Sequence, residues 1–395
     1  MFKTVTLVRV SLVLVSMLGL VSLAGCPSSA PDSTADRPAM ELSLTEEPSP
    51  TGEVSGEPSA AEETEAQTPR KKSELFLELP LDLCNTADAM CLLPDGNIIL
   101  SVPNFNDQSQ QPLFMKITPD NEAEVFMELP NHPETGKPIG PLGICVAPSG
   151  DLFFGDLQQE VQRKSRVMRI GMEDGRPREL IPAIEGFTVA NALIIRDGYL
   201  YVSETQMDPD AKPCVSGVFR FKLDELEDAI VVLATPFAED PHLIGTMETF
   251  DEELPLGADG LAFDKEGNLY VGNFAGGTVH RFQFDNEGNV TSNEIFARAD
   301  FMKSADGLFF DPVTDKIYVA DSRSNAVQVV SLDGSVETLA QNGVTDGLDG
   351  GMDQPCEVLL RGRELIVSNM DWPVPGGLNT QYDKPCTLSV IKLDE

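Results

Sequence analysis

A single pattern of apolar and polar positions recurs six times along the chain. Each unit contains a short apolar run, a turn with Gly or a close substitute, and a second apolar run that ends on a polar residue. Pairs of β-rich runs joined by turns such as Pro-Asp-Gly or Lys-Glu-Gly-Asn are typical of β-hairpins. Six hairpins are therefore expected, over residues 87–102, 141–156, 190–204, 258–273, 305–321 and 355–369.

The spacing of the hairpins indicates how they assemble. Corresponding positions lie 54, 49, 68, 47 and 50 residues apart, and a period of roughly 50 residues is typical of repeat folds. Further strand-like runs follow several hairpins, as at 278–285 and 290–297. Four strands in each of six units predict an all-β fold, a six-bladed β-propeller.

The propeller is expected to span residues 73–395. The C-terminal run at 386–395 would supply the third strand of the last blade, and residues 73–80 its fourth. This arrangement places both ends of the domain in one blade and leaves no exposed sheet edge there. Helical periodicity is confined to 222–234, which we interpret as a decorated outer strand pair.

The N-terminal region is predicted to be a targeting signal and a stalk. Residues 1–25 combine two basic residues with an apolar run too short for a membrane span of about 20 residues, as in a secretory signal peptide. The Leu-Ala-Gly-Cys at 23–26 resembles the lipobox of bacterial lipoproteins and implies acylation of Cys26, with ordinary secretion as the alternative. Residues 26–72, rich in Pro, Glu, Ser and Thr, are predicted to form a disordered linker. We expect a bacterial cell-envelope protein, lipid-anchored to an extracytoplasmic membrane face, periplasmic or at the cell surface.

The charge of the chain narrows the range of partners. It has 28 Lys and Arg against 64 Asp and Glu, a formal net charge of −36. A chain without a basic surface repels phosphate backbones and anionic lipid headgroups, so nucleic-acid binding is excluded and only the lipid anchor would contact the membrane. Cations, or neutral substrates held by a cation, are the expected partners of a monomer.

The polar residue that opens each repeat is the main chemical signal. In a propeller the first strand of each blade lines the central channel, so these side chains should face a common point. Four of these side chains carry oxygen, and carboxylates and an amide gathered at one point repel one another unless a cation binds between them. Oxygen donors without a His partner favour a hard cation such as Ca²⁺. The alternative is that they only cap the turns that enter the strands. The six positions hold Asp88, Leu142, Asn191, Asp259, Asp306 and Cys356.

The repeats also resemble a known family. Asp-Gly-Leu at 259–261, within ADGLAFDKEGNLYVGNFAGGTVHRF, and Asn191 ahead of LIIRDGYLYVSE are similar to the regucalcin/gluconolactonase/luciferin-regenerating six-bladed propellers. The resemblance implies a divalent metal on the propeller axis, held by Asp88, Asn191 and Asp259. It also implies metal-assisted lactone hydrolysis, with Asp259 as both ligand and proton donor and acceptor.

The chain departs from this family in three places. The blade-one acid is Asp88 in Asp-Ala-Met, where the family typically has Glu in Glu-Gly-Pro. The blade-two positions that often grip a sugar lactone are Ile139 and Pro141, which cannot hydrogen-bond through their side chains. Asp306 adds a carboxylate in blade five, as a fourth candidate metal ligand. A sugar lactone would need partners from elsewhere.

Three long segments are expected at the rim of the channel. Loops at 205–217 and 370–386 follow the second strands of blades three and six, and 239–255 would form a partial lid. Trp372 and Tyr382 are candidates to stack on a substrate, or else they only cover the rim.

Six cysteines remain when Cys26 is set aside. An even number in an oxidising compartment favours disulfides, and fifteen pairings are possible, so the connectivity stays open. The cysteines are Cys84, Cys91, Cys145, Cys214, Cys356 and Cys386.

Two functions remain in view. We favour an extracytoplasmic, Ca²⁺-dependent hydrolase of lactone or ester type, with Asp259 as the catalytic residue. The alternative is a non-catalytic propeller that binds a protein, a glycan or a cell-wall component at its rim, since a propeller scaffold serves both roles.

Overall fold

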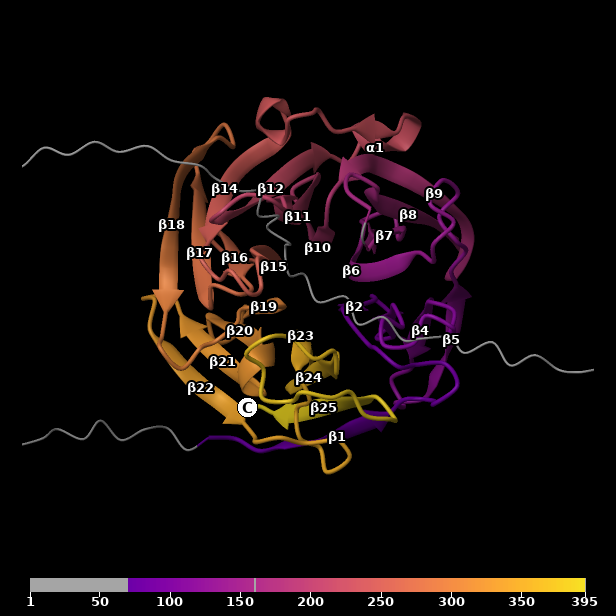
Figure 1. Ribbon diagram of the computed structural model, residues 1–395, viewed down its shortest axis with the longest axis vertical. Helices are drawn as coiled ribbons and strands as arrows, with labels where there is room; N and C mark the ends of the chain where they lie inside the picture. The colour runs from indigo at the N-terminus through magenta and orange to yellow at the C-terminus, as the bar shows by residue number, and fades with distance from the viewer. Residues whose placement is uncertain (1–69, 160, 395) are drawn as a thin grey trace, which may run out of the picture. The chain divides into compact units, whose positions relative to one another are not determined.

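The computed structural model describes residues 70–159 and 161–394. Its strands form six sheets that surround a central axis, and all strand pairs but one are antiparallel (Figure 1). The sequence prediction of an all-β, six-bladed β-propeller is therefore confirmed. The predicted signal peptide, Cys26 and nearly all of the predicted linker lie outside the described residues.

The first three blades follow one another along the chain, each with its innermost strand first. Blade one contains β2 (Met90–Leu92), β3 (Ile98–Val102), β4 (Leu113–Ile117) and β5 (Ala123–Glu128). Blade two contains β6 (Gly140–Val146), β7 (Leu152–Leu157), β8 (Ser165–Glu173) and β9 (Arg176–Phe187). Blade three contains β10 (Ala190–Arg196), β11 (Tyr199–Asp208), β12 (Cys214–Lys222) and β14 (Leu243–Thr249).

The remaining blades complete the ring. Blade four contains β15 (Ala258–Phe263), β16 (Leu269–Asn273), β17 (Thr278–Phe284) and β18 (Val290–Arg298). Blade five contains β19 (Leu308–Asp311), β20 (Lys316–Asp321), the 3₁₀ turn η2 (Ser322–Ser324), β21 (Ala326–Ser331) and β22 (Val336–Gln341). Blade six contains β23 (Pro355–Arg361), β24 (Glu364–Asn369), β25 (Thr387–Lys392) and β1 (Ser73–Glu78).

The N-terminal strand closes the ring. β1 pairs antiparallel with β25, with Ser73 opposite Ile391 and Glu78 opposite Thr387. Residues 73–80 thus supply the fourth strand of blade six, as the sequence predicts. Because the first and last strands share a sheet, opening the ring requires this ladder to separate.

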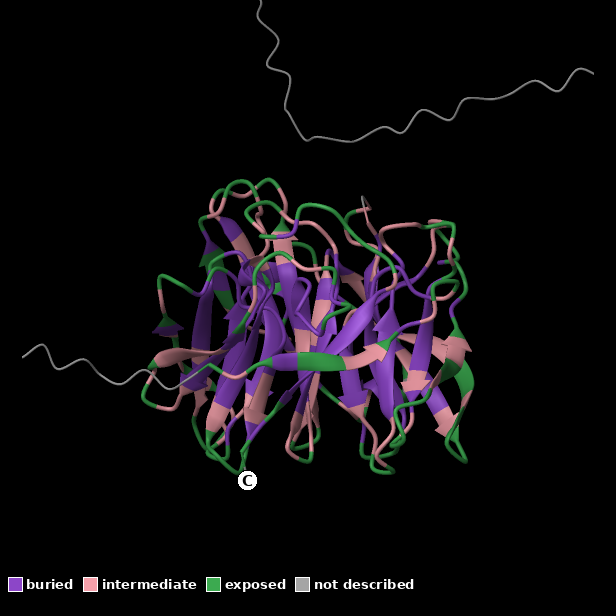
Figure 2. Ribbon diagram, turned by 90° about the horizontal axis from the view of Figure 1, so that it is seen from below, coloured by how far each residue is buried: buried purple, intermediate pink, exposed green. Residues whose placement is uncertain are grey.

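Apolar side chains between neighbouring blades form the core. One cluster joins blades one and two, where Phe114 of β4 and Phe154 of β7 pack edge to face at 4.9 Å. Figure 2 shows buried residues along the strands and exposed residues concentrated in the loops at both ends. Each blade therefore buries both faces of its sheet against its neighbours, which sets the distance between the inner strands.

Two segments differ from their predicted structure. The stretch 222–234 is not an outer strand pair; it forms the short helix α1 (Glu225–Asp228) and the strand β13 (Val231–Val232), which pairs parallel with β9 of blade two. The stretch 239–255 is not a continuous lid: after the 3₁₀ turn η1 (Phe237–Glu239), Leu243–Thr249 is β14, the outer strand of blade three, and residues 250–255 form the loop that leads to β15. β14 completes the four strands of blade three, whereas β13 adds a fifth strand to blade two. In both segments, backbone pairing with a neighbouring strand decided the conformation.

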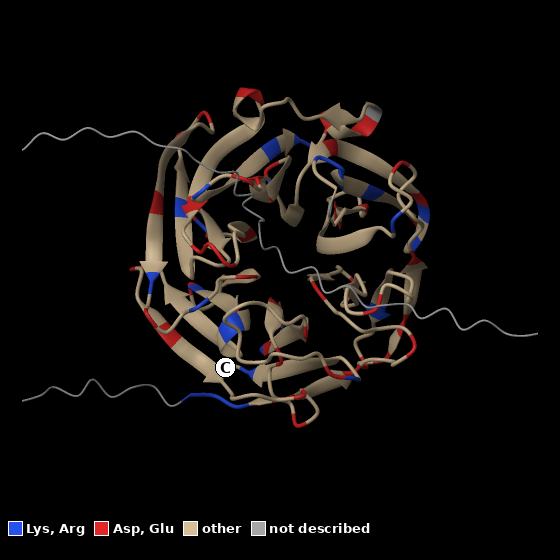
Figure 3. Ribbon diagram, viewed as in Figure 1, with Lys and Arg blue, Asp and Glu red and all other residues tan. Residues whose placement is uncertain are grey.

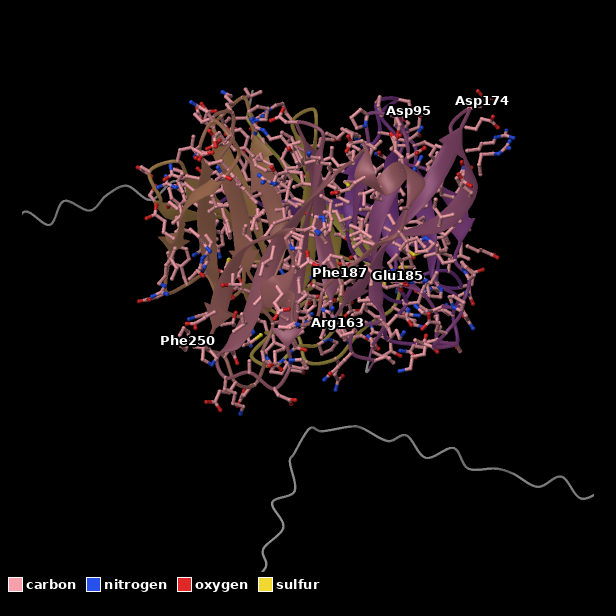
Figure 4. All side chains as sticks on the ribbon, turned by 90° about the horizontal axis from the view of Figure 1, so that it is seen from above. Asp95, Arg163, Asp174, Glu185, Phe187 and Phe250 are labelled. Atoms are coloured by element: carbon pink, nitrogen blue, oxygen red, sulfur yellow. The ribbon has the colours of Figure 1, made fainter. Side chains whose placement is uncertain are left out.

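The two faces of the propeller differ in their loops. Figure 4 shows Arg163 and Phe250 toward one face, and Asp95 and Asp174, which lie in hairpin turns, toward the other. The inner strands begin at the face of Phe250, which we call the rim face. Within the described part of the chain, helices are too short to cross a membrane.

Candidate axial site

The start of each inner strand brings a polar side chain toward the axis. Asp88 precedes β2, Asn191 and Asp259 are the second residues of β10 and β15, and Asp306 lies just before β19. Their charges act on one another: burial raises the pKa of Asp259 most, and the charges of Asp306, Asp88 and Glu357 raise it further. The structure therefore brings together the four oxygen-bearing residues that the sequence analysis singled out.

Backbone irregularities aim these side chains. The pairing register shifts within β10, β15 and β23, between Ala190 and Leu193, Ala258 and Leu261, and Pro355 and Glu357. A bulge re-aims the side chain that it carries. In blade six it makes Glu357, rather than only Cys356, part of the axial group. Sequence analysis missed Glu357 because aligning the repeats assigns a single axial residue to each blade. A bulge adds a residue to the strand, and the alignment cannot detect it.

Glycines allow the inner strands to approach closely. A Cβ at Gly307 would lie 2.6 Å from the carbonyl oxygen of Cys356 and would also overlap the side chain of Glu357. A Cβ at Gly260 would overlap the carbonyl oxygen of Asp306, and one at Gly143 would lie 2.5 Å from that of Asn191. Any side chain there would push neighbouring blades apart, so the repeated Gly next to the axial residue sets the width of the channel.

The axial carboxyls share a low-dielectric setting. Burial raises the pKa of Asp88 to about 7. Burial also raises the pKa of Asp259, of Asp306 and of Glu357, and repulsion among the carboxylates adds to each shift. Ser322 Oγ donates a 2.8 Å hydrogen bond to Asp306 Oδ2, and this bond lowers the pKa of Asp306 against the larger effect of burial. Without a positive charge nearby, burial and mutual repulsion disfavour the ionised forms of these carboxyls.

Asn191 is held in place by a short chain of hydrogen bonds. Its Nδ2 donates to Thr205 Oγ1 at 3.2 Å, and that hydroxyl donates to the carbonyl oxygen of Ala258 at 2.7 Å. A further hydrogen bond between Asn191 and Asp259 lowers the pKa of the carboxyl against the larger effect of burial. The amide is thus fixed between blades three and four beside Asp259.

The axial residues fit a hard cation by their chemistry. Their donors are carboxylate and amide oxygens, and Asp88 Oδ2 is buried without a hydrogen-bond partner. Such an oxygen is costly unless a ligand completes its contacts. As placed, however, no three His, Cys, Asp or Glu side chains among the described residues form a group that could hold a metal ion. A cation would have to draw the side chains closer together.

The two aromatic candidates at the rim differ in their burial. Trp372 is half-buried and packs against Phe105 of blade one, with ring centroids 5.2 Å apart. Tyr382 is exposed. Beside Phe105, a cavity of about 120 Å³ lies between the rim loops of blades one and two, and Ile139 is part of its lining. Acidic residues occur around the whole ring (Figure 3).

The six described cysteines are buried free thiols. Cys84 precedes β2 and Cys386 precedes β25, and the two thiols hydrogen-bond to each other. Cys91 and Cys145 lie on the inner strands of blades one and two, close enough for their charges to interact. The sequence predicts disulfides, whereas the structure contains free thiols at these six positions, with Cys84 beside Cys386 and Cys91 near Cys145.

Comparison with solved structures bears on the fold. A gluconolactonase from Xanthomonas campestris is 14% identical with a TM-score of 0.51, and the match covers 82% of this chain and 95% of that chain. A calcium-binding regucalcin from Agrobacterium tumefaciens is 12% identical with a TM-score of 0.51, over the same shares. A protein described as an oxidoreductase (glucose dehydrogenase) from Thermus thermophilus is 16% identical with a TM-score of 0.55, over 82% of this chain and 100% of that chain.

No family model and no curated protein matches the chain. The resemblance to regucalcin and gluconolactonase propellers is confirmed in the fold, and identities of 12–16% show the fold alone. Since one neighbour is described as an oxidoreductase, the function has to be argued from the residues of the site.

Proposed function

We propose that the protein is a metal-dependent hydrolase that acts on a lactone or a similar ester. The observation that carries the proposal is the axial group itself: buried carboxyls from blades one, four, five and six beside an amide from blade three, with Asp88 Oδ2 left without a partner. Keeping such a group together is costly, and perturbed buried carboxyls of this kind concentrate at functional sites.

Asp88, Asn191 and Asp259 would hold the cation, and Asp306 would join them as a fourth ligand. Oxygen donors of this kind favour Ca²⁺. When bound, such an ion polarises a carbonyl oxygen and acidifies a coordinated water.

Asp259 is the residue best placed to move the proton. Its carboxyl would accept a proton from the attacking water and return it to the departing ring oxygen. Asn191 orients this carboxyl through their hydrogen bond, and Ser322 orients Asp306. The protein groups thus supply proton transfer and orientation.

The substrate should be less polar than a sugar lactone. Ile139 is buried and Pro141 lies within β6, so neither blade-two position can grip a sugar hydroxyl. The apolar face of Phe105 and the ring of Trp372 lie at the same rim. This lining favours a lactone or ester with an apolar body. It also keeps the non-catalytic alternative in place, in which the rim binds an apolar envelope ligand.

The test is hydrolysis of a panel of lactones and aryl esters by the full chain, with Ca²⁺ and with EDTA. We expect cation-dependent turnover that falls by about 10²-fold or more in Asp259→Asn, the scale of a lost acid–base group. Asp120→Asn, in an exposed turn, is the matched control. Hydrolysis that survives in Asp259→Asn would overturn the catalytic assignment. A cation-induced rise in melting temperature without any hydrolysis would support the non-catalytic alternative.

We also propose that the protein is lipid-anchored through Cys26 in the bacterial envelope. The support is the lipobox-like Leu-Ala-Gly-Cys followed by a polar linker. An oxidising compartment would allow Cys84 and Cys386 to pair. Replacement of Cys26 by Ala should move the protein from the membrane fraction to the soluble fraction, and unchanged fractionation would contradict the anchor.

A further inference from the structure

A second pair of buried carboxyls lies in the loops of blade six. The antiparallel pairing of β23 and β24 continues beyond their ends, because Met370 N donates to Gln354 O at 3.0 Å and Asp371 N donates to Asp353 O at 3.4 Å. Asp353 and Asp371 therefore stand opposite each other across two backbone segments. Only 2% of Asp353 and 3% of Asp371 is exposed. Like charges directly opposite each other destabilise a ladder.

The hydrogen bonds of this pair leave one oxygen bare. Asn379 Nδ2 donates to Asp353 Oδ1, and the backbone N–H of Asp383 donates to Asp371 Oδ2 at 2.6 Å. Asp371 Oδ1 is buried and has no hydrogen-bond partner. A bare carboxylate oxygen inside a protein marks a place where another atom completes the contacts.

The surroundings of the pair are acidic. Burial raises the pKa of Asp353 to about 7, and the charges of Asp383 and Asp346 add to the shift. Burial raises the pKa of Asp371 to about 8, and Asp353 and Asp383 add to it. No basic side chain contributes to either shift. A bound cation would offset the negative charge of this group.

We propose that the carboxylates of Asp353 and Asp371 bind a hard divalent cation, Ca²⁺, at the rim of blade six, separate from the axial site. Ca²⁺ accepts six to eight oxygen ligands in flexible geometry, so two carboxylates can be supplemented by water and by a third acid. Asp383 is exposed and its charge reaches both partners, which makes it that third acid. The described side chains contain no ready group of three ligands, so Asp383 has to turn inward when the ion binds.

The ion would fix the rim loop at 370–386. Asp371 begins this loop, and its carbonyl oxygen accepts a 2.8 Å hydrogen bond from Asn106 Nδ2 of blade one. Trp372, the next residue, packs against Phe105 of blade one. Binding at Asp371 would thus tie blade six to the rim of blade one.

Trp372 supplies a local probe. It is the only tryptophan in the chain, and a Tb³⁺ ion that replaces Ca²⁺ beside Asp371 would be sensitised by its indole. With the full chain, we expect Tb³⁺ emission on tryptophan excitation, displaced by Ca²⁺. Asp371→Asn and Asp353→Asn should weaken Tb³⁺ binding by about tenfold or more, the scale for removing a carboxylate that supports a metal site. Asp259→Asn should retain the emission, since its carboxyl lies at the axis.

Two further variants keep the test independent of folding. Asp383→Asn changes an exposed side chain and should weaken Tb³⁺ binding with an unchanged melting temperature, whereas Asp120→Asn should change neither. Emission that is absent in the wild type, or equal in the wild type, Asp371→Asn and Asp383→Asn, would overturn the proposal and indicate that the pair shares a proton instead. Loss of emission in Asp259→Asn alone would assign the ion to the axis and would also overturn it. Hydrolysis plays no part in these readouts, so failure of the proposed activity leaves the result interpretable.

Discussion

Arg166 and Asp156 form a buried ion pair at the rim of blade two. Arg166 Nη2 and Nε lie 2.6 Å and 3.0 Å from Asp156 Oδ2, and the two side chains are 5% and 0% exposed. The other oxygen of Asp156 accepts from Gly140 N at 3.2 Å and from Gln158 Nε2 at 2.7 Å. A single carboxylate thus ties β8 to the start of β6 and the end of β7.

Removal of this carboxylate should destabilise the propeller strongly. We expect Asp156→Ala to lower the free energy of unfolding by about 3–5 kcal/mol, because it leaves a buried, unpaired guanidinium. Urea unfolding measures the change. The exposed pair of Glu74 and Lys392 is the control, and Glu74→Ala should have no measurable effect. Equal effects of the two substitutions would contradict the importance given to burial.

The channel width should depend on Gly307. Gly307→Ala places a Cβ against the backbone of Cys356 and the side chain of Glu357, and overpacking of this kind costs about 1–3 kcal/mol. We expect a lower melting temperature and weaker cation binding at the axis. Gly343→Ala, where a Cβ meets no atom within 4 Å, is the matched control and should leave both unchanged. If Gly307→Ala left the melting temperature and cation binding unchanged, the inner strands would not be in close contact.

The stability of the protein should fall as the pH rises from weakly acidic to weakly basic. Glu204 is fully buried, and burial raises its pKa from 4.5 to about 7, against the effect of hydrogen bonds from the N–H groups of Thr188, Val189 and Gln206. A raised native pKa means that the folded state binds the proton more tightly than the unfolded state. The contribution of Glu204 is therefore fully present below its unfolded pKa and is lost as the pH rises through about 7.

Glu204→Gln tests this dependence. Its free energy of unfolding should change less between about pH 5 and about pH 8 than that of the wild type, by up to about 1.4 kcal/mol per pH unit. Denaturant unfolding in EDTA across that range provides the comparison. An identical pH slope in the two proteins would show that Glu204 does not titrate there.

Cys84 and Cys386 should form a disulfide when the protein is oxidised. Both are buried, and their thiols hydrogen-bond to each other between the segment that follows β1 and the segment that precedes β25. Two thiols lose two protons and two electrons to a disulfide or quinone oxidant, and the sulfurs join. Peptide mapping without reduction should show this link in the wild type and not in Cys386→Ser. Recovery of six alkylated thiols from the oxidised protein would contradict it.

Local sequence patterns predicted most of the fold. A hairpin needs alternating apolar residues and a suitable turn, and both lie within about 15 residues of chain, so the six repeats were recognisable. The strand at 73–80 was also foreseen, because blade six lacked a fourth strand. By contrast, 222–234 and 239–255 adopt structures set by neighbouring strands, and their own residues did not specify the outcome.

The chain by itself therefore determined the number of blades, the ring closure and the identity of Asp88, Asn191, Asp259 and Asp306 as axial candidates. These follow from periodicity and from the rule that the first strand of a blade lines the channel. Only the tertiary structure added Glu357 to the axial group, through a bulge in β23, and placed Asp353 opposite Asp371. Both relationships depend on backbone register and on burial between distant segments, which periodicity along a single chain does not contain.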